Sequence, residues 1–216
     1  CGVDKCVGLG AALIGRGMIM CRIWGASGFT RSIQIYKGNL SEGIVYTKDY
    51  TGSYKKVGEM FKESREILKR FKMEKTYAII GIYYDYPDKV PEGKQRASIG
   101  IYKKKSTDFM KPNEELEKYV LENGYKKNAI PSTPSLYSDW YFMNMLSLIV
   151  GINKFYKELN LNLENETFRK QYKVKSKEYK CSLELYDSPD VVKFYVPTTN
   201  EDKFMIHDTL KDAKTE

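Results

Sequence analysis

The sequence predicts an α+β fold built from two halves of the same order (strand, helix, strand, strand), with two long helices packed on an antiparallel sheet. Short runs rich in tyrosine, isoleucine and valine alternate with polar residues, which is typical of half-buried strands. Two longer stretches carry apolar residues at helical spacing. The 216-residue chain, with 42% hydrophobic and 30% charged residues, is long enough for one sizeable core.

The first half begins with period-two alternation and contains one amphipathic stretch. Its predicted elements are strands near Ile33 and Ile35 and over 43–50, a helix over 54–71, and strands over 77–84 and 96–102. Ser53 is expected to cap the helix, and a short helix over 114–123 follows the last strand. In the proline-bearing loop 85–93, Asp85 is expected to bond nearby backbone amides.

The second half repeats this order. Its predicted elements are strand-like residues 125–136, a helix over 139–159 capped by Ser138, a polar linker over 160–177, and strands over 179–186 and 191–196. The match of Tyr84-Asp85 with Tyr186-Asp187 supports a duplication.

The chain divides into a possible membrane-anchoring segment over 1–29, a domain over 30–200 and a polar tail over 201–216. The segment from Val7 to Phe29 is rich in glycine, alanine and large aliphatic residues, but a spanning helix needs about 20 apolar residues. Arg16 and Arg22 interrupt it, and each costs about 2.5–3.5 kcal/mol in mid-membrane. An interfacial helix, or a segment packed on the domain, is the alternative.

Several classes of function are disfavoured. The net charge of +8 is spread along the chain without the basic stripe of a nucleic-acid-binding protein. The single histidine, His207, falls in the predicted tail, which disfavours a metal site and an imidazole-based triad. We also expect no cofactor. Three of the four cysteines lie within the first 21 residues, which fits a reducing compartment.

The run Tyr83 to Gly100, with its Tyr-Tyr-Asp-x-Pro and Val-Pro elements, resembles the signature loop of the GyrI-like domain superfamily, and Leu183 to Pro189 resembles its terminal hairpin. Within that superfamily the sequence is most similar to autophagy receptors of the endoplasmic reticulum. The resemblance implies a receptor anchored in that membrane, with its domain in the cytosol. It also implies autophagosomal ubiquitin-like partners, bound through a tail motif absent from this sequence. Tyr156-Lys-Glu-Leu159 has the motif's spacing but is expected to pack within a helix.

The resemblance also implies an alternative function, a small-molecule cleft between the halves that is lined by aromatic rings and holds a carboxylate for cationic or hydrophobic ligands. The position that matches the carboxylate is Glu184. It alternates with Leu183 and Leu185 and so faces either the cleft or solvent. Trp140, Tyr83 and Tyr84 are candidate walls of the cleft, or core residues. Hydrolysis of reactive small molecules is a third implication, but no nucleophile and base occur at a recognisable spacing, so we expect no enzyme.

Overall fold

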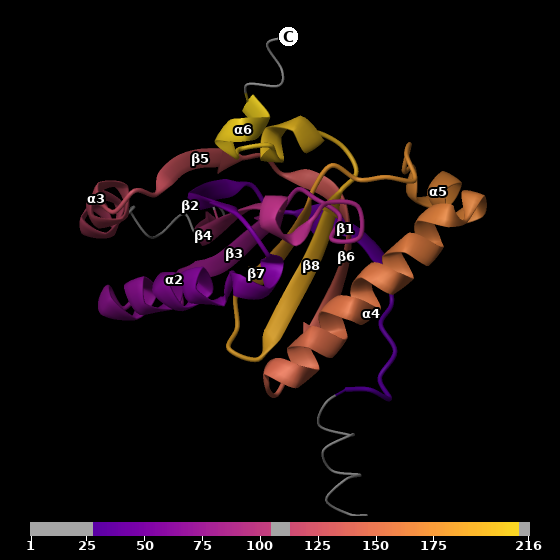
Figure 1. Ribbon diagram of the computed structural model, residues 1–216, viewed down its shortest axis with the longest axis horizontal. Helices are drawn as coiled ribbons and strands as arrows, with labels where there is room; N and C mark the ends of the chain where they lie inside the picture. Colours follow the sequence, from indigo (N-terminus) through magenta and orange to yellow (C-terminus); the bar gives the residue numbers. More distant parts are fainter. Residues whose placement is uncertain (1–27, 105–112, 212–216) are drawn as a thin grey trace, which may run out of the picture.

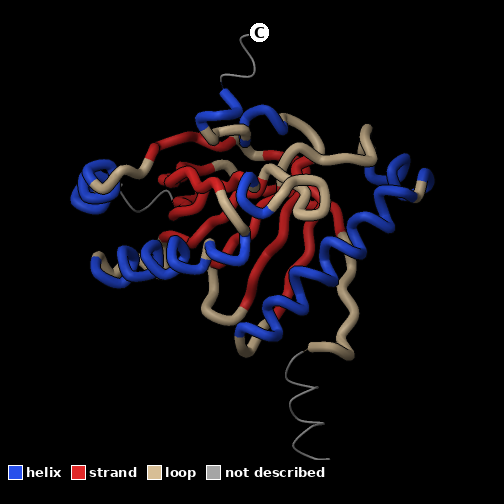
Figure 2. Tube along the Cα trace, in the orientation of Figure 1, coloured by secondary structure: helices blue, strands red, loops and turns tan. Residues whose placement is uncertain are grey.

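The computed structural model describes residues 28–104 and 113–211, which form a curled antiparallel sheet with its two long helices on one face (Figures 1 and 2). The strands are β1 (Tyr36–Leu40), β2 (Gly43–Thr51), β3 (Tyr77–Tyr83), β4 (Arg96–Lys104), β5 (Lys126–Ile130), β6 (Thr133–Tyr141), β7 (Ser182–Tyr186) and β8 (Val191–Pro197). The helices are α2 (Gly58–Arg70), α3 (Glu114–Glu122), α4 (Met145–Glu164), α5 (Glu166–Tyr172) and α6 (Asp208–Lys211), with short 3₁₀ turns η1 (Tyr54–Lys56), η2 (Glu92–Lys94) and η3 (Glu201–Phe204).

The strand order, β1-β6-β8-β7-β3-β4-β2-β5, shows the duplication directly. Read from its two edges toward its centre, the sheet has matching strands at equal positions. The matching pairs are β1 and β5, β6 and β2, β8 and β4, and β7 and β3. The halves meet where β3 pairs with β7, and Gly81 lies opposite Glu184 there. The first strand of each half pairs with the other half, β1 with β6 and β5 with β2. The predicted architecture is therefore confirmed. Two strands precede the long helix in each half, and in the second half β5 and β6 replace the single run predicted over 125–136.

Both faces of the central strands are buried. On β3, Ile79 faces the core beneath α2, while Ile80 and Ile82 face the opposite core. That opposite core is closed by Phe204 and Ile206, which are 0% and 6% exposed. The prediction of a polar tail is wrong over this part of the segment, because the residues after β8 fold back and cover the sheet.

The boundaries of the second long helix also differ from the prediction. Strand β6 continues through Trp140, and α4 begins only at Met145. Asn144 caps it instead of Ser138, since the Asn144 side chain accepts from the amide of Ser147 while the Ser147 hydroxyl accepts from the Asn144 amide. The predicted linker is largely helical as α4 and α5, and the strand expected near Ile33 begins at Tyr36.

The repeat match of Tyr84-Asp85 with Tyr186-Asp187 is also wrong by one residue. Tyr84 packs in the core closed by the C-terminal segment, whereas Tyr186 packs beneath the helices. Since side chains alternate along a strand, a shift of one residue places them on opposite faces.

None of the helices within residues 28–104 and 113–211 is long and apolar enough to cross a membrane. The predicted anchoring segment 1–29 lies outside these residues, apart from its last two.

Candidate functional site

A buried carboxylate lies at the centre of the sheet, on the face that carries α2 and α4. Glu184 occupies the middle of β7 and is 4% exposed. Leu183 and Leu185 point to the opposite core, so Glu184 is directed beneath the helices. The alternative that it faces solvent is wrong.

Tyrosines surround this carboxylate. The hydroxyls of Tyr186 and Tyr83 both donate to Glu184 Oε2, at 2.9 and 3.1 Å. Beside them, the hydroxyls of Tyr156 on α4 and Ser182 on β7 are 2.7 Å apart. The group thus combines β3, β7 and α4, which come from both halves of the chain.

Aromatic rings from the flanking elements cover the tyrosines. The ring of Phe61, on α2, meets Tyr186 edge-on at 5.3 Å, and Phe142, just before α4, meets Tyr186 at 6.2 Å. Tyr54 packs edge-on against Tyr83 at 5.0 Å. Gly81 provides room for this layer, because a Cβ atom there would lie 2.8 Å from Phe61 Cζ. The carboxylate and its tyrosines are therefore covered by a layer of aromatic rings that come from both halves of the chain.

Burial controls the protonation of this group. It raises the pKa of Glu184 to about 7, and the hydrogen bonds from Tyr186 and Tyr83 oppose the rise. Burial and the neighbouring carboxylate also raise the pKa of Tyr83 and of Tyr186, so both remain hydrogen-bond donors at neutral pH. In the part of the chain that the structure describes, no lysine, arginine or histidine pairs with Glu184. Near neutral pH the site therefore changes between a neutral acid and an unpaired anion.

The four residues predicted for the cleft separate into two groups. Tyr83 and Glu184 are brought together by the β3–β7 pair. Tyr84 lies on the other face, where its hydroxyl donates to Ser98 and its ring meets His207 edge-on. Trp140 is 1% exposed in the core beneath α4 and donates its indole N–H to the carbonyl of Ser147. The structure thus places Trp140 and Tyr84 in cores.

Sequence reasoning missed Tyr186, Tyr156 and the covering ring of Phe61. Tyr186 has a clear signal, because it lies two residues after Glu184 on one strand and must share its face. Tyr156 and Phe61 come from distant helices, and nothing local to Glu184 indicates them.

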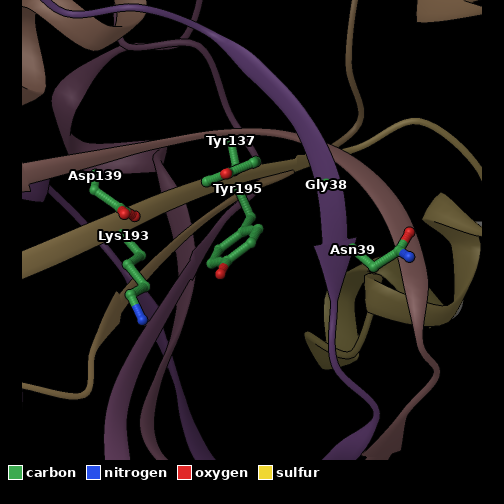
Figure 3. A pocket seen from close by; sticks show the side chains of 6 residues that line it. All are labelled: Gly38, Asn39, Tyr137, Asp139, Lys193 and Tyr195. Carbon is green, nitrogen blue, oxygen red and sulfur yellow. The ribbon is translucent and has the colours of Figure 1, made fainter.

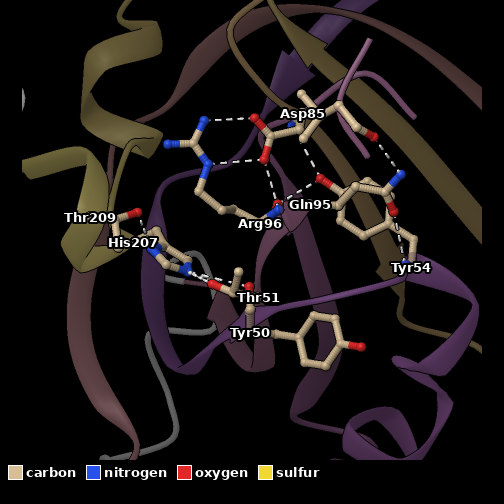
Figure 4. Close-up of polar contacts among 9 residues, drawn as sticks. Tyr50, Thr51, Tyr54, Asp85, Gln95, Arg96, His207 and Thr209 are labelled. Carbon is tan, nitrogen blue, oxygen red and sulfur yellow. Dashed lines mark hydrogen bonds and ion pairs between the residues drawn. The ribbon is translucent and has the colours of Figure 1, made fainter. Parts of the chain in front are cut away.

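A second buried carboxylate, Asp85, lies two residues after the end of β3 and has a different environment (Figure 4). Its side chain accepts from the backbone N–H of Arg96 at 2.7 Å and from Arg96 Nε and Nη2 at 2.9 and 2.6 Å. The prediction that Asp85 bonds a nearby amide is confirmed. Gln95 continues the network by accepting from the amide of Tyr54 and donating to the carbonyl of Val90. This cluster fixes the 85–93 loop.

His207 is buried rather than part of a free tail. It is 3% exposed, its Nε2 lies 3.2 Å from the carbonyl oxygen of Tyr50, and its Nδ1 lies 3.0 Å from the hydroxyl of Thr209 (Figure 4). These contacts attach the C-terminal segment to the end of β2. Within the described ranges, no group of histidine, cysteine or acidic side chains is arranged to hold a metal ion.

An open depression lies on the face of the sheet opposite the helices (Figure 3). Its volume is about 260 Å³, and it is lined by Gly38, Asn39, Tyr137, Asp139, Lys193 and Tyr195. Lys193 and Tyr195 alternate with Phe194, which packs beneath α4. The depression and Glu184 are therefore on different faces.

No protein-family model matches the sequence, and no curated protein matches it. Solved structures of low identity are similar in outline. The C-terminal domain of EcmrR is 12% identical, with 76% of this chain and 96% of that chain covered and a TM-score of 0.45. An integron cassette protein of Vibrio cholerae is 11% identical, with 77% and 97% covered and a TM-score of 0.48. SAV2435 bound to tetraphenylphosphonium is 10% identical, with 77% and 94% covered and a TM-score of 0.47. At these values the similarity carries no functional argument, and we base function on the residues around Glu184.

The expectations that came only from the family resemblance stay predictions. These are the location in the endoplasmic-reticulum membrane, the receptor role and its ubiquitin-like partners, and hydrolysis. The absence of nucleic-acid binding also stays a prediction. Tyr156-Lys-Glu-Leu159 is unsuited to partner binding, because Leu159 is fully buried and Tyr156 faces the Glu184 site.

Proposed function

We propose that this protein is a small-molecule-binding module whose ligand is an organic cation with apolar surface, held against Glu184 between α2 and α4. The observation that carries the proposal is a buried carboxylate with tyrosine hydroxyls as its hydrogen-bond partners and no cationic one among the described residues. Burying an anion without a counter-charge is costly, and the attraction of a bound cation offsets part of that cost.

The surroundings of Glu184 suit such a ligand. The hydroxyls of Tyr83 and Tyr186 contact the carboxylate, and the ring of Phe61 packs on that of Tyr186. Aromatic rings attract cations with their faces and bury apolar area. Because Glu184 is 4% exposed, binding requires rings such as Phe61 and Phe142 to swing away. We expect ligands large enough to replace the contacts that these rings lose.

Tetraphenylphosphonium is the test probe, since it joins one positive charge to four apolar rings. Triphenylphosphine oxide is the neutral comparison. At pH 8, calorimetric titration of the full chain is expected to show binding of the cation but not of the neutral molecule. Glu184→Gln keeps the size and loses the charge, and is expected to weaken cation binding about tenfold or more, which is about 1.4 kcal/mol.

The matched control is Glu66→Gln, the same change at an exposed position on α2, which is expected to leave binding unchanged. Equal affinity of the wild-type chain and Glu184→Gln for the cation would overturn the proposal. So would equal affinity of the wild-type chain for the charged and the neutral molecule.

A further inference from the structure

An exposed apolar surface lies at the start of α4. Of the nine large apolar side chains exposed in the described part of the chain, five lie between residues 141 and 149. We call four of them the α4 patch: Met143, Met145, Leu146 and Ile149, which are 69%, 68%, 46% and 48% exposed. Residues 140–153 contain no charged side chain, although 30% of the whole chain is charged. Contiguous apolar surface of this kind marks an interaction site.

The patch is held rigidly. The Asn144–Ser147 capping box fixes the first turn of α4, and the Ser147 hydroxyl also accepts from the amide of Met143. The inner side of the helix is closed by Trp140, whose ring lies where a Cβ atom of Gly151 would stand. Met145, Leu146 and Ile149, spaced three and four residues apart, therefore form one outward stripe.

The chain enters the described structure at this same place. Gly28 packs on the ring of Trp140, and the ammonium of Lys154 on α4 donates to the carbonyls of Gly28 and Phe29. Phe29 is itself 48% exposed. In Figure 1 the indigo segment from residue 28 lies at the end of α4 that carries the patch. Directly before it in the sequence stands the apolar stretch from Val7.

We infer that the α4 patch, together with Phe29, docks on the surface of a lipid bilayer. Apolar side chains on an uncharged helix face enter the interface between headgroups and acyl chains. In the sequence, an apolar stretch directly precedes Phe29, whose backbone carbonyl is held by Lys154 of α4.

The charges around the patch fit an anionic lipid surface. Arg31 and Lys154 lie at its margin, where Arg31 donates to the carbonyl of Tyr141 and its guanidinium lies 4.5 Å from the centre of the Trp140 ring. Basic residues near an anionic leaflet are attracted to its negative surface potential. In the adjoining β7–β8 turn, Asp187 is paired with Lys193. Asp190 accepts a hydrogen bond from the Ser188 hydroxyl and keeps its negative charge, so the two basic residues at the margin outnumber the one acid without a cationic partner in this turn.

The test is the environment of a fluorescent label on the patch of the full chain. Cys1, Cys6 and Cys21 are replaced by serine, and Cys181 is 1% exposed and does not react. A single cysteine at Met145→Cys or Ile149→Cys carries an environment-sensitive dye. With vesicles of phosphatidylcholine and phosphatidylserine, we expect a blue shift in emission and quenching by lipids brominated on their acyl chains.

The control position is Leu161→Cys, which is 59% exposed near the other end of the same helix and is expected to show neither change. Quenching at 145 and 149 but not at 161 supports the inference. Labels that stay water-like at 145 and 149, whether or not the chain sediments with vesicles, overturn it. A shift that depends on protein concentration without vesicles also overturns it, since the occupant would then be a second copy of the chain.

Discussion

Asp85 and Glu184 both carry buried carboxylates, Asp85 just after β3 and Glu184 on the neighbouring β7, and they differ in what neutralises their charge. The Asp85 side chain is 5% exposed and accepts three hydrogen bonds from Arg96, two of them from the guanidinium. Glu184 is 4% exposed and accepts from two tyrosine hydroxyls. The charge of Asp85 is therefore neutralised by Arg96. Glu184 has hydrogen-bond donors but no cationic partner among the described residues.

This difference separates an acid that stabilises a loop from the acid to which we assign ligand binding. A buried ion pair with well-formed hydrogen bonds holds its surroundings in one geometry, and Asp85 with Arg96 fixes the loop after β3. A buried acid with a raised pKa and no counter-charge is instead a candidate functional group. Burial alone therefore does not mark a candidate site, whereas burial without a counter-charge does.

The largest effect is expected from breaking the satisfied pair. Arg96→Met leaves Asp85 buried and unpaired, and is expected to lower the free energy of unfolding by about 3 kcal/mol, measured by urea denaturation. The double variant Asp85→Asn/Arg96→Met should recover part of this loss, because Asn carries no charge. Lys55→Ala, which removes an exposed ion pair with Glu92, serves as the control and should change little. A loss after Arg96→Met no greater than that of the control would show that Asp85 needs no counter-charge.

At Glu184, removing the charge is expected to raise the free energy of unfolding at pH 8 rather than lower it. A rise of its pKa from 4.5 to about 7 in the folded state means that wild-type stability falls as pH increases through this range and is level above it. The expected total fall is about 3 kcal/mol. Glu184→Gln removes this term, so the variant should match the wild type near pH 4.5 and exceed it at pH 8 in urea denaturation. Parallel stability profiles for the two proteins would mean that the carboxylate is not destabilised by burial.

A smaller loss is expected from crowding the layer above the site. Gly81→Ala places a Cβ atom 2.8 Å from Phe61 Cζ and 3.1 Å from the Tyr83 ring, and overpacking of this kind costs about 1–3 kcal/mol. Gly58→Ala at the start of α2, where nothing lies within 4 Å, is the control. The midpoints of thermal unfolding of the two variants are compared. Equal midpoints would show that Phe61 and Tyr83 move aside for the added methyl group at no cost in stability.

The smallest expected effect is a change in the pKa of Glu184 after loss of one hydrogen bond. Tyr186→Phe removes the 2.9 Å hydrogen bond to Glu184 Oε2, and since that bond lowers the pKa of Glu184, the pKa should rise further. NMR titration of the labelled Glu184 carboxyl carbon measures it. Tyr137→Phe on the opposite face of the sheet provides the comparison and should leave the titration of Glu184 unchanged. A midpoint unaltered by Tyr186→Phe would contradict the assigned bond.

Local patterns in the sequence predicted that Glu184 faces away from Leu183 and Leu185, but not whether that side of the strand is buried. Alternation with Leu183 and Leu185 fixes which side of β7 it occupies, and the turn chemistry after β3 indicated the amide bond of Asp85. The rings that bury Glu184 come from α2 and α4, far away in the chain. Their contact depends on how the halves meet, which periodicity does not encode.

The errors in the elements have a similar cause. The sequence of residues 138–141 is compatible with a strand or with the first turn of a helix. These residues form a strand because β6 pairs with β8 as far as Tyr141. Phe204 and Ile206 are too few to form a pattern, and their burial follows from the apolar face that β3 and β7 present.

The affinity for tetraphenylphosphonium as a function of pH tests the central claim most directly. If the ligand pairs with ionised Glu184, the affinity of the wild-type chain rises as pH increases through about 7 and then levels off. Glu184→Gln should bind weakly and without dependence on pH across the same range. An affinity of the wild-type chain that does not change between pH 5.5 and pH 8.5, or one that Glu184→Gln reproduces, would contradict the account.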